Sequence, residues 1–187
     1  MSVLAPGRNI VLVGLMGAGK TTIGRRVAAR LGRPFVDTDA EVEQAAGSTV
    51  ADIFAAHGER GFRSLEAAAV RRVAALRGQV IAVGGGAILD PANATQLRST
   101  GDLVLLDGDP TVLAQRVGRG ASRPLLQGSE DLAKRLSTLR AERAGAYSEA
   151  ASHVIDTTTG QLDEIAGAVI AWAQTKPGLL SRDEVQL

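Results

Sequence analysis

Residues 14–22, with the sequence GLMGAGKTT, constrain the fold of this chain more than any other stretch. They follow the apolar run IVLV at residues 10–13 and precede a helical pattern. Glycines in such a loop let backbone N–H groups approach phosphate oxygens without a Cβ atom in the way, and the helix adds its positive N-terminal end. The pattern G-x-x-x-x-G-K-[ST] is matched at Gly14, Gly19, Lys20 and Thr21. We therefore predict a strand, a phosphate-binding loop and a helix, in a protein that binds ATP or GTP.

The side chains of this loop have distinct expected roles. Lys20 is placed to reach the β and γ phosphates, and the Thr21 hydroxyl is placed to ligate Mg²⁺. The residues expected to contact ATP are Gly17, Ala18, Gly19, Lys20, Thr21 and Thr22. Because switch proteins, motors and small-molecule kinases all carry such a loop, the residues around the acceptor must decide between these classes.

Short apolar runs alternate with helical patterns along the rest of the chain. Runs of this length are typical of strands covered on both faces, as in parallel sheets. We expect strands at 10–13, 34–36, 80–83, 103–106 and 153–155. We expect helices over 22–31, 41–46, 49–57, 61–76, 93–99, 111–117, 130–142 and 161–174, with Gly58 ending the third. The alternation predicts a three-layer α/β/α sandwich around a central five-stranded parallel sheet.

The domain organisation follows from the same pattern. No linker divides the chain, so we expect a single domain over residues 1–175. Residues 176–187 combine Pro, Gly and mixed charge at the terminus, and we expect them to form a disordered tail.

Composition excludes several classes of protein. The 187 residues carry 21 basic and 20 acidic side chains, and this balance does not indicate binding to nucleic acid or to a membrane surface. The absence of cysteine excludes disulfides, thiolate metal sites and a cysteine nucleophile. No apolar run approaches the ~18 residues that span a bilayer, and the N-terminal MSVLAPGRN lacks the build of a signal peptide. We expect a cytoplasmic monomer.

Two carboxylates follow the second expected strand, in the stretch FVDTDAEVE. Asp37 and Asp39 are two residues apart, so on a strand they would share one face and point into the crevice at the carboxyl edge of the sheet. One carboxylate can then hold the Mg²⁺ shell through water while the other accepts a hydrogen bond from an attacking hydroxyl. The alternative is a solvated turn with an N-cap aspartate before the helix at 41–46.

Two arginines each allow a functional and a structural interpretation. Arg63 suits a bidentate grip on a carboxylate, but Glu59 and Glu66 flank it at helical salt-bridge spacing. Arg143 lies in the stretch RAERAGAYSEA, where a solvated helix face is the alternative. Composition and spacing leave both questions open.

A glycine triplet follows the third expected strand, in VIAVGGGAILD. Three glycines allow a ligand to approach the backbone closely at the carboxyl edge of the sheet. A plain turn rarely requires three, so we expect Gly84, Gly85 and Gly86 to contact a ligand.

A basic loop is expected in the stretch RVGRGASRPLL, which supplies Arg116, Arg119 and Arg123. Such a loop is either a lid over phosphates or a nucleic-acid contact. The net charge of +1 and the aromatic content of 3% favour a mobile lid, which we place at about residues 116–128.

Taken together in this order and spacing, the motifs resemble the shikimate kinase family of P-loop enzymes, which have the nucleoside-monophosphate-kinase fold. The resemblance runs from GLMGAGKTTIGRRVA through DTD, ADIF, GGGA and RPLL to ERAGAY, over nearly the whole chain. It implies ATP-dependent phosphorylation of the 3-hydroxyl of shikimate, a step of chorismate and aromatic amino-acid biosynthesis. It also implies one Mg²⁺ ion per subunit, with shikimate and ATP as the partners.

The resemblance implies roles for the acceptor residues. Asp39 would bind the shikimate hydroxyls and orient or deprotonate the one attacked, and Asp37 would act in the Mg²⁺ shell through water. Arg63 and Arg143 would clamp the substrate carboxylate, so the resemblance favours their functional interpretation. The backbone N–H of Gly85 would contact the substrate.

The resemblance also implies roles around the nucleotide. Lys20 and the lid residue Arg123 would act in catalysis by neutralising charge on the transferred group, and Arg116 would flank adenine. Members of the family often carry polar or basic residues after the D-T of the last strand. This chain has DTTTGQ there, and a backbone contact from Thr158 or Thr159 is the alternative.

Two other functions stay open on the sequence. A small-molecule kinase of the same architecture, such as a gluconate kinase, would share the phosphate loop and the lid. A nucleotide-dependent regulatory module would share the loop but have no small acceptor.

Overall fold

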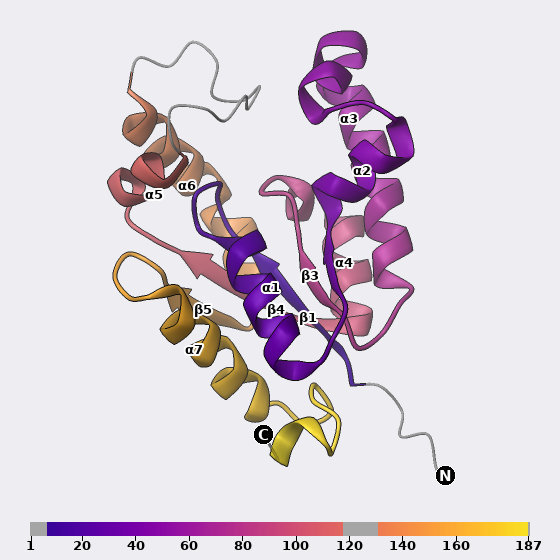
Figure 1. Cartoon of the computed structure of the whole chain (residues 1–187). Helices are drawn as coiled ribbons and strands as arrows, with labels where there is room; N and C mark the ends of the chain where they lie inside the picture. The colour runs from indigo at the N-terminus through magenta and orange to yellow at the C-terminus, as the bar shows by residue number, and fades with distance from the viewer. Residues whose placement is uncertain (1–6, 118–130, 187) are drawn as a thin grey trace.

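The computed structural model describes residues 7–117 and 131–186, and its centre is a five-stranded parallel sheet (Figure 1). The strand order is β2-β3-β1-β4-β5, and all neighbours run parallel. The strands are β1 (Asn9–Val13), β2 (Phe35–Asp37), β3 (Val80–Ala82), β4 (Gly101–Asp107) and β5 (His153–Asp156). The helices are α1 (Lys20–Leu31), α2 (Thr38–Ala46), α3 (Val50–Ala74), α4 (Pro91–Thr100), α5 (Pro110–Val117), α6 (Leu132–Ala150) and α7 (Leu162–Gln174), with 3₁₀ turns η1 (Ala87–Leu89) and η3 (Glu184–Gln186).

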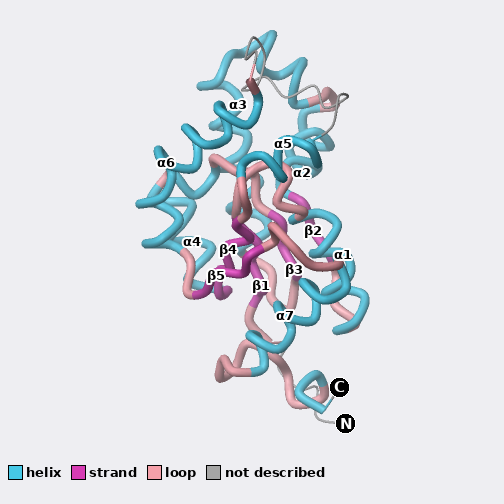
Figure 2. The backbone as a smooth tube through the Cα atoms, turned by 90° about the vertical axis from the view of Figure 1, so that its left-hand side faces the viewer, coloured by secondary structure: helices cyan, strands magenta, loops and turns pink. Residues whose placement is uncertain are grey.

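Helices lie on both faces of the sheet, which makes three layers (Figure 2). On one face α1 packs against α7, and on the other α4 packs against α3 and β4. Parallel strands cannot be joined by tight hairpins, and the helices between successive strands supply the crossovers. The predicted three-layer sandwich with a five-stranded parallel sheet is therefore confirmed. Within the described ranges, no helix has the length and apolar character needed to span a membrane.

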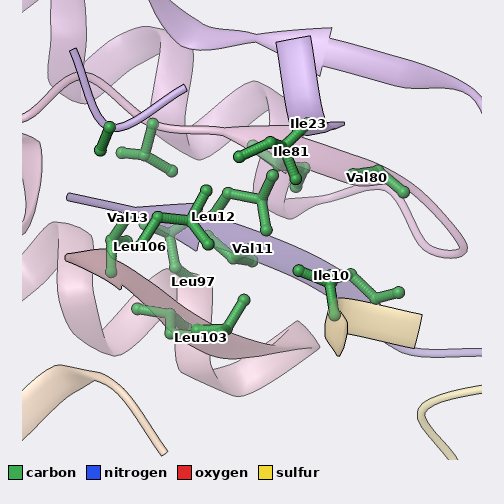
Figure 3. Close-up of a cluster of buried hydrophobic side chains, with 14 of the residues drawn as sticks. Ile10, Val11, Leu12, Val13, Ile23, Val80, Ile81, Leu97, Leu103 and Leu106 are labelled. Carbon is green, nitrogen blue, oxygen red and sulfur yellow. The ribbon is translucent and has the colours of Figure 1, made fainter. Parts of the chain in front are cut away.

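The main hydrophobic core is built around β1, which lies in the middle of the sheet. All five of its residues are buried, and Figure 3 shows residues 10–13 among the side chains of neighbouring strands and helices, such as Ile81 and Leu97. The edge strand β5 differs, because it buries only Ile155 and leaves Val154 55% exposed. The expectation that the strands are covered on both faces is therefore confirmed for β1 and wrong for β5.

The long helix α3 is interrupted at Gly58, where φ is 65° and ψ is −175°. Glycine adopts this left-handed φ without the steric cost that a Cβ atom brings. The two arms on either side of Gly58 correspond to the helices predicted over 49–57 and 61–76. Thr49 caps the first arm, because its hydroxyl accepts a hydrogen bond of 3.2 Å from the backbone N–H of Asp52.

The helices α2 and α3 enclose a small hydrophobic cluster of their own. Four residues of this cluster are buried and are grouped apart from the main core: Val42, Ile53, Phe62 and Ala69. Figure 1 shows the start of α3 projecting beyond the sheet, next to α2. We call residues 38–74 the α2–α3 lobe.

The segment after α7 departs from the expected disordered tail. Leu179 is fully buried and Leu180 nearly so, which ties this segment to the main core. The buried Arg33 donates to the backbone oxygen of Leu179 over 2.8 Å and to the two carboxylate oxygens of Glu184 over 2.5 and 2.8 Å. Arg33 also donates to the backbone oxygen of Arg8 over 2.8 Å. The composition suggested disorder, but two buried leucines and one buried ion pair hold this segment against the end of α1.

Candidate active site

A cavity of about 1140 Å³ opens at the carboxyl edge of the sheet. The phosphate loop, the ends of β2 and β3, the α2–α3 lobe, α5 and α6 all contribute to its lining. Of the predicted site residues, the lining includes Gly17, Ala18, Gly19, Lys20, Thr21, Thr22, Asp37, Asp39, Arg63, Gly84, Gly85, Gly86, Arg116 and Arg143. Elements far apart in the sequence therefore bring the predicted nucleotide and acceptor residues together.

The phosphate loop has the backbone that the glycine pattern predicts. Gly14, Gly17 and Gly19 all have positive φ, at 143°, 81° and 88°. A Cβ atom on Gly17 would lie 2.4 Å from the backbone oxygen of Leu113 in α5, so the loop passes too close to α5 for a side chain. The Lys20 ammonium donates to the backbone oxygens of Gly14 and residue 15, both at 2.9 Å. Backbone oxygens of the loop thus fix the position of the lysine side chain.

Asp37 connects the phosphate loop to the α2–α3 lobe. It accepts a hydrogen bond of 2.7 Å from the Thr21 hydroxyl through one oxygen and one of 3.0 Å from the Asp39 N–H through the other. Asp37 is therefore the N-cap of α2, as the structural alternative predicted, and also a lining residue of the cavity. The two interpretations of this residue are compatible.

The donor set next to the phosphate loop fits Mg²⁺. The Thr21 hydroxyl and the Asp37 carboxylate supply hard oxygen atoms, which this ion prefers. In the part of the chain that the structure describes, no three His, Cys, Asp or Glu side chains are grouped so that they could hold a metal alone. An ion at this place would need phosphate oxygens or water to complete its shell.

Asp39 lies in the first turn of α2 rather than on β2. The prediction that both carboxylates share one face of a strand is therefore wrong in its geometry, although both line the cavity. A Cβ atom on Gly84 would lie 2.7 Å from an oxygen of Asp39 and 2.8 Å from an oxygen of Glu66. A side chain at this position would displace both carboxylates from where they lie.

Arg63 is held by the two acidic residues at helical spacing. It donates to Glu66 over 2.7 Å and to Glu59 over 3.0 Å. The side chain of Glu66 is 2% exposed and that of Glu59 is 60% exposed, so the inner ion pair is the buried one. Burial raises the pKa of the Glu66 carboxyl, an effect that Arg63 and Arg143 oppose and the Asp39 carboxylate reinforces. The salt bridges predicted as an alternative are confirmed, and they aim the arginine at the cavity.

Arg143 is buried, with 4% of its surface exposed, so the interpretation as part of a solvated helix face is wrong. It donates a hydrogen bond of 2.9 Å to the backbone oxygen of Gly85, and the Tyr147 hydroxyl donates to the same oxygen over 2.7 Å. Burial raises the pKa of Tyr147, so its hydroxyl remains a donor at neutral pH. Two side chains of α6 thus fix the middle peptide of the glycine triplet.

Arg116 lies at the end of α5 and lines the cavity. Its guanidinium reaches Thr157 Oγ1 and the backbone oxygen of Thr158, both at 3.4 Å. The Thr158 hydroxyl accepts a hydrogen bond of 2.9 Å from the N–H of Asp109, which joins the loops after β4 and β5. Arg119, Arg123 and all but the first two residues of the predicted lid lie outside the described residues.

Sequence reasoning missed three residues of this site: Thr38, Glu66 and Tyr147. Glu66 is polar and one turn from an arginine, which is also the pattern of a surface ion pair. Tyr147 appeared in the sequence only as a neighbour of Arg143. Their burial was the missing signal, and it depends on packing between distant segments.

A family model described as shikimate kinase matches residues 16–174. The chain belongs to the shikimate kinase family. Shikimate kinase of Symbiobacterium thermophilum is 51% identical over 90% of this chain and 97% of its own length. Shikimate kinase of Pelotomaculum thermopropionicum is 46% identical over 87% of this chain and 94% of its own length. The resemblance inferred from the motifs is therefore confirmed.

Solved structures agree with this membership. Shikimate kinase from Acinetobacter baumannii in complex with shikimate has a TM-score of 0.86, with 38% identity over 90% of this chain and 93% of its own. A gluconokinase from Sinorhizobium meliloti 1021 has a TM-score of 0.56 and 23% identity over 89% of this chain and 90% of its own, and shares the fold alone. The chain is therefore a P-loop kinase, and the alternative of a nucleotide-dependent regulatory module is set aside.

Proposed function

We propose that this chain transfers the γ-phosphoryl group of ATP to the 3-hydroxyl of shikimate, which yields ADP and shikimate 3-phosphate. The reaction is a step of chorismate and aromatic amino-acid biosynthesis. Membership of the shikimate kinase family supports this assignment. The observation that carries it is the single cavity shared by the phosphate loop, two carboxylates, two arginines and a glycine triplet.

The nucleotide is assigned to the phosphate-loop end of the cavity. Backbone N–H groups of residues 17–22 and the N-terminal end of α1 bind the phosphates. In this structure the Lys20 ammonium donates to backbone oxygens of the same loop. With ATP bound, it neutralises charge on the β and γ phosphates. Arg116, near Thr157 and Thr158, flanks adenine. Thr21 and, through water, Asp37 would hold Mg²⁺, which would neutralise charge at the phosphates.

The acceptor is assigned to the end formed by the α2–α3 lobe and α6. Arg63 on α3 and Arg143 on α6 both line this end. Guanidinium groups bind a carboxylate through paired hydrogen bonds. Asp39 accepts a hydrogen bond from the hydroxyl that attacks, and the N–H of Gly85 contacts the ring substituents. Two fixed arginines and one carboxylate define both the position and the orientation of a small anionic polyol.

Catalysis in such a site rests on positioning and on charge. The transition state of phosphoryl transfer is loose, so the protein supplies little covalent chemistry. Asp39 takes the proton of the attacking hydroxyl, and Lys20 together with the lid residue Arg123 stabilises the transferred group. Closure of the lid over the nucleotide excludes water and suppresses ATP hydrolysis.

The experiment that tests this function measures ADP release from Mg·ATP with shikimate, with gluconate and without an acceptor. We expect rapid release with shikimate and slow release in the other two reactions. Equal release with gluconate would point to a different small-molecule kinase. Release that ignores every acceptor would contradict the assignment of the acceptor end. A monomeric state and a cytoplasmic location are further predictions, and the first is tested by light scattering in solution.

A further inference from the structure

The residue between the two site carboxylates has a contact of its own. Thr38 is fully buried and begins α2. Its hydroxyl oxygen accepts a hydrogen bond of 2.9 Å from the backbone N–H of Gly84, the first residue of the glycine triplet, and this bond is buried. The side chain thus connects the end of β2 to the loop after β3.

Three consecutive residues thereby hold three parts of the cavity together. Asp37 binds the Thr21 hydroxyl of the phosphate loop, Thr38 binds the N–H of Gly84, and Asp39 faces the cavity beside that glycine. The N–H of Asp39 itself donates to Asp37 over 3.0 Å. The backbone that carries the Asp39 carboxylate is therefore fixed from both sides.

Two carboxylates lie close to Gly84. An atom at the Cβ position of Gly84 would lie 2.7 Å from Asp39 Oδ1 and 2.8 Å from Glu66 Oε1. A buried N–H that loses its acceptor destabilises the backbone around it, because an unpaired buried donor costs free energy. Without the Thr38 hydroxyl, the Gly84 N–H loses its buried acceptor, and the loop beside the Asp39 carboxylate has to shift to pair that N–H again.

We propose that the Thr38 hydroxyl is a positioning group for the reaction, because it sets the distance between the Asp39 carboxylate and the glycine triplet. It acts through Asp39 and Gly84 and does not touch the substrate. The proposal rests on the function proposed above, since it concerns alignment of the acceptor hydroxyl with the γ-phosphoryl group. The proposal therefore predicts that loss of the Thr38 hydroxyl lowers turnover and leaves nucleotide binding unchanged.

The test compares Thr38→Val, which keeps the shape and removes the hydroxyl, with Thr38→Ser, which restores it. We expect Thr38→Val to lower kcat with shikimate by about 10- to 100-fold, since one buried hydrogen bond is lost beside the Asp39 carboxylate. The KM for ATP and the Kd for Mg·ADP should change by no more than about twofold, because the phosphate loop keeps its contacts. Thr38→Ser should recover kcat to within about threefold of the unmodified protein.

Thr175→Val is the matched control, because the Thr175 hydroxyl donates over 2.7 Å to the backbone oxygen of Trp172, outside the cavity. This variant should keep kcat and both KM values. A Thr38→Val protein with unchanged kcat, or with kcat and nucleotide affinity reduced in the same proportion, would overturn the proposal. An unmodified protein without shikimate-dependent ADP release would instead refute the proposed function. If Thr38→Val does not fold, Thr38→Ala decides, because activity equal to that of Thr38→Ser overturns the proposal and a large loss supports it.

Discussion

The Thr21 hydroxyl donates a 2.7 Å hydrogen bond to the Asp37 carboxylate, and this bond joins the first turn of α1 to the end of β2. The two residues come from neighbouring elements of the phosphate-binding edge. A hydroxyl and a carboxylate at this distance would both act on one hydrated cation. The pair therefore links nucleotide binding to the α2–α3 lobe, whose helix α2 is capped by the same aspartate.

Asp37→Asn should raise the Mg²⁺ concentration required for half-maximal activity by about 10- to 100-fold, the usual effect of losing an outer-shell ligand. Asparagine is a good N-cap, so α2 should keep its stability. Titration of activity with Mg²⁺ at saturating ATP measures the effect. Asp183→Asn, at an exposed position away from the cavity, is the control. An unchanged Mg²⁺ requirement would show that Asp37 acts only as a cap.

Asp39→Asn should lower turnover by ~10²–10⁴-fold, since it removes a positioned general base. The fold and the affinity for ATP should be retained, because the side chain faces the acceptor end of the cavity. Initial rates and calorimetric titration with Mg·ADP measure the two quantities. A tenfold loss or less would mean that Asp39 only binds the acceptor.

Glu66→Gln should raise the KM for shikimate by about 10- to 100-fold, because hydrogen bonds to charged groups are strong and Arg63 would lose its buried partner. The matched control is Glu59→Gln, which removes the exposed partner of the same arginine. Exposed ion pairs contribute little, so its KM should stay within about twofold. Equal changes in the KM for shikimate in the two variants would contradict the interpretation that the buried ion pair positions Arg63 for substrate binding.

Glu184→Gln should make the free energy of unfolding less dependent on pH between about 2 and 4.5. Burial alone would raise the pKa of Glu184, but hydrogen bonds from Arg33 and Ser181 outweigh it and lower the pKa to about 2, from 4.5. Because the folded-state pKa is the lower one, the ionised carboxylate stabilises the fold above pH ~4.5, and this contribution is lost as the pH falls toward 2. The variant should lose ~2 kcal/mol of unfolding free energy at pH 7.

Urea unfolding between pH 7 and pH 2, followed by circular dichroism, measures this contribution, with Asp183→Asn as the control. The difference between Glu184→Gln and the unmodified protein should be constant above pH ~4.5 and should vanish near pH 2. A difference that is absent at pH 7 would contradict a stabilising role for the segment after α7.

Arg123→Ala should lower turnover much more than it weakens shikimate binding. An arginine on the phosphates stabilises charge that develops in the transition state, so its loss is felt in kcat. Steady-state kinetics with varied shikimate, together with a shikimate titration at equilibrium, separate the two effects. Unchanged turnover would remove Arg123 from the mechanism.

The fold was largely predictable because buried strands and amphipathic helices leave simple patterns. The differences arise where polar residues are buried by tertiary contacts. β4 begins at Gly101 although Asp102 is polar, because Arg8 pairs with that carboxylate over 2.9 Å. The helix predicted over 130–142 runs on to Ala150, because Arg143 and Tyr147 turn inward to the glycine triplet.

The site was predictable where a motif fixes the chemistry. The phosphate loop and the aspartate pair belong to this group. Partners of those residues were harder to identify, since a buried glutamate and a surface glutamate look alike at the same helical spacing. Glu66, the inner partner of Arg63, lies beside Gly84 in the loop after β3, a contact between distant segments that no local pattern records.

The separate hydrophobic cluster of the α2–α3 lobe affects which substitutions the protein can accept near the acceptor end of the cavity. Four buried residues of this lobe, Val42, Ile53, Phe62 and Ala69, are grouped apart from those that pack around β1, whereas the end of α3 joins the main core through residues 70–74. Substitutions at these four positions can reshape the lobe beside the proposed acceptor end without removing a side chain from the core around β1. One fold can therefore carry different acceptor sites beside the same phosphate loop.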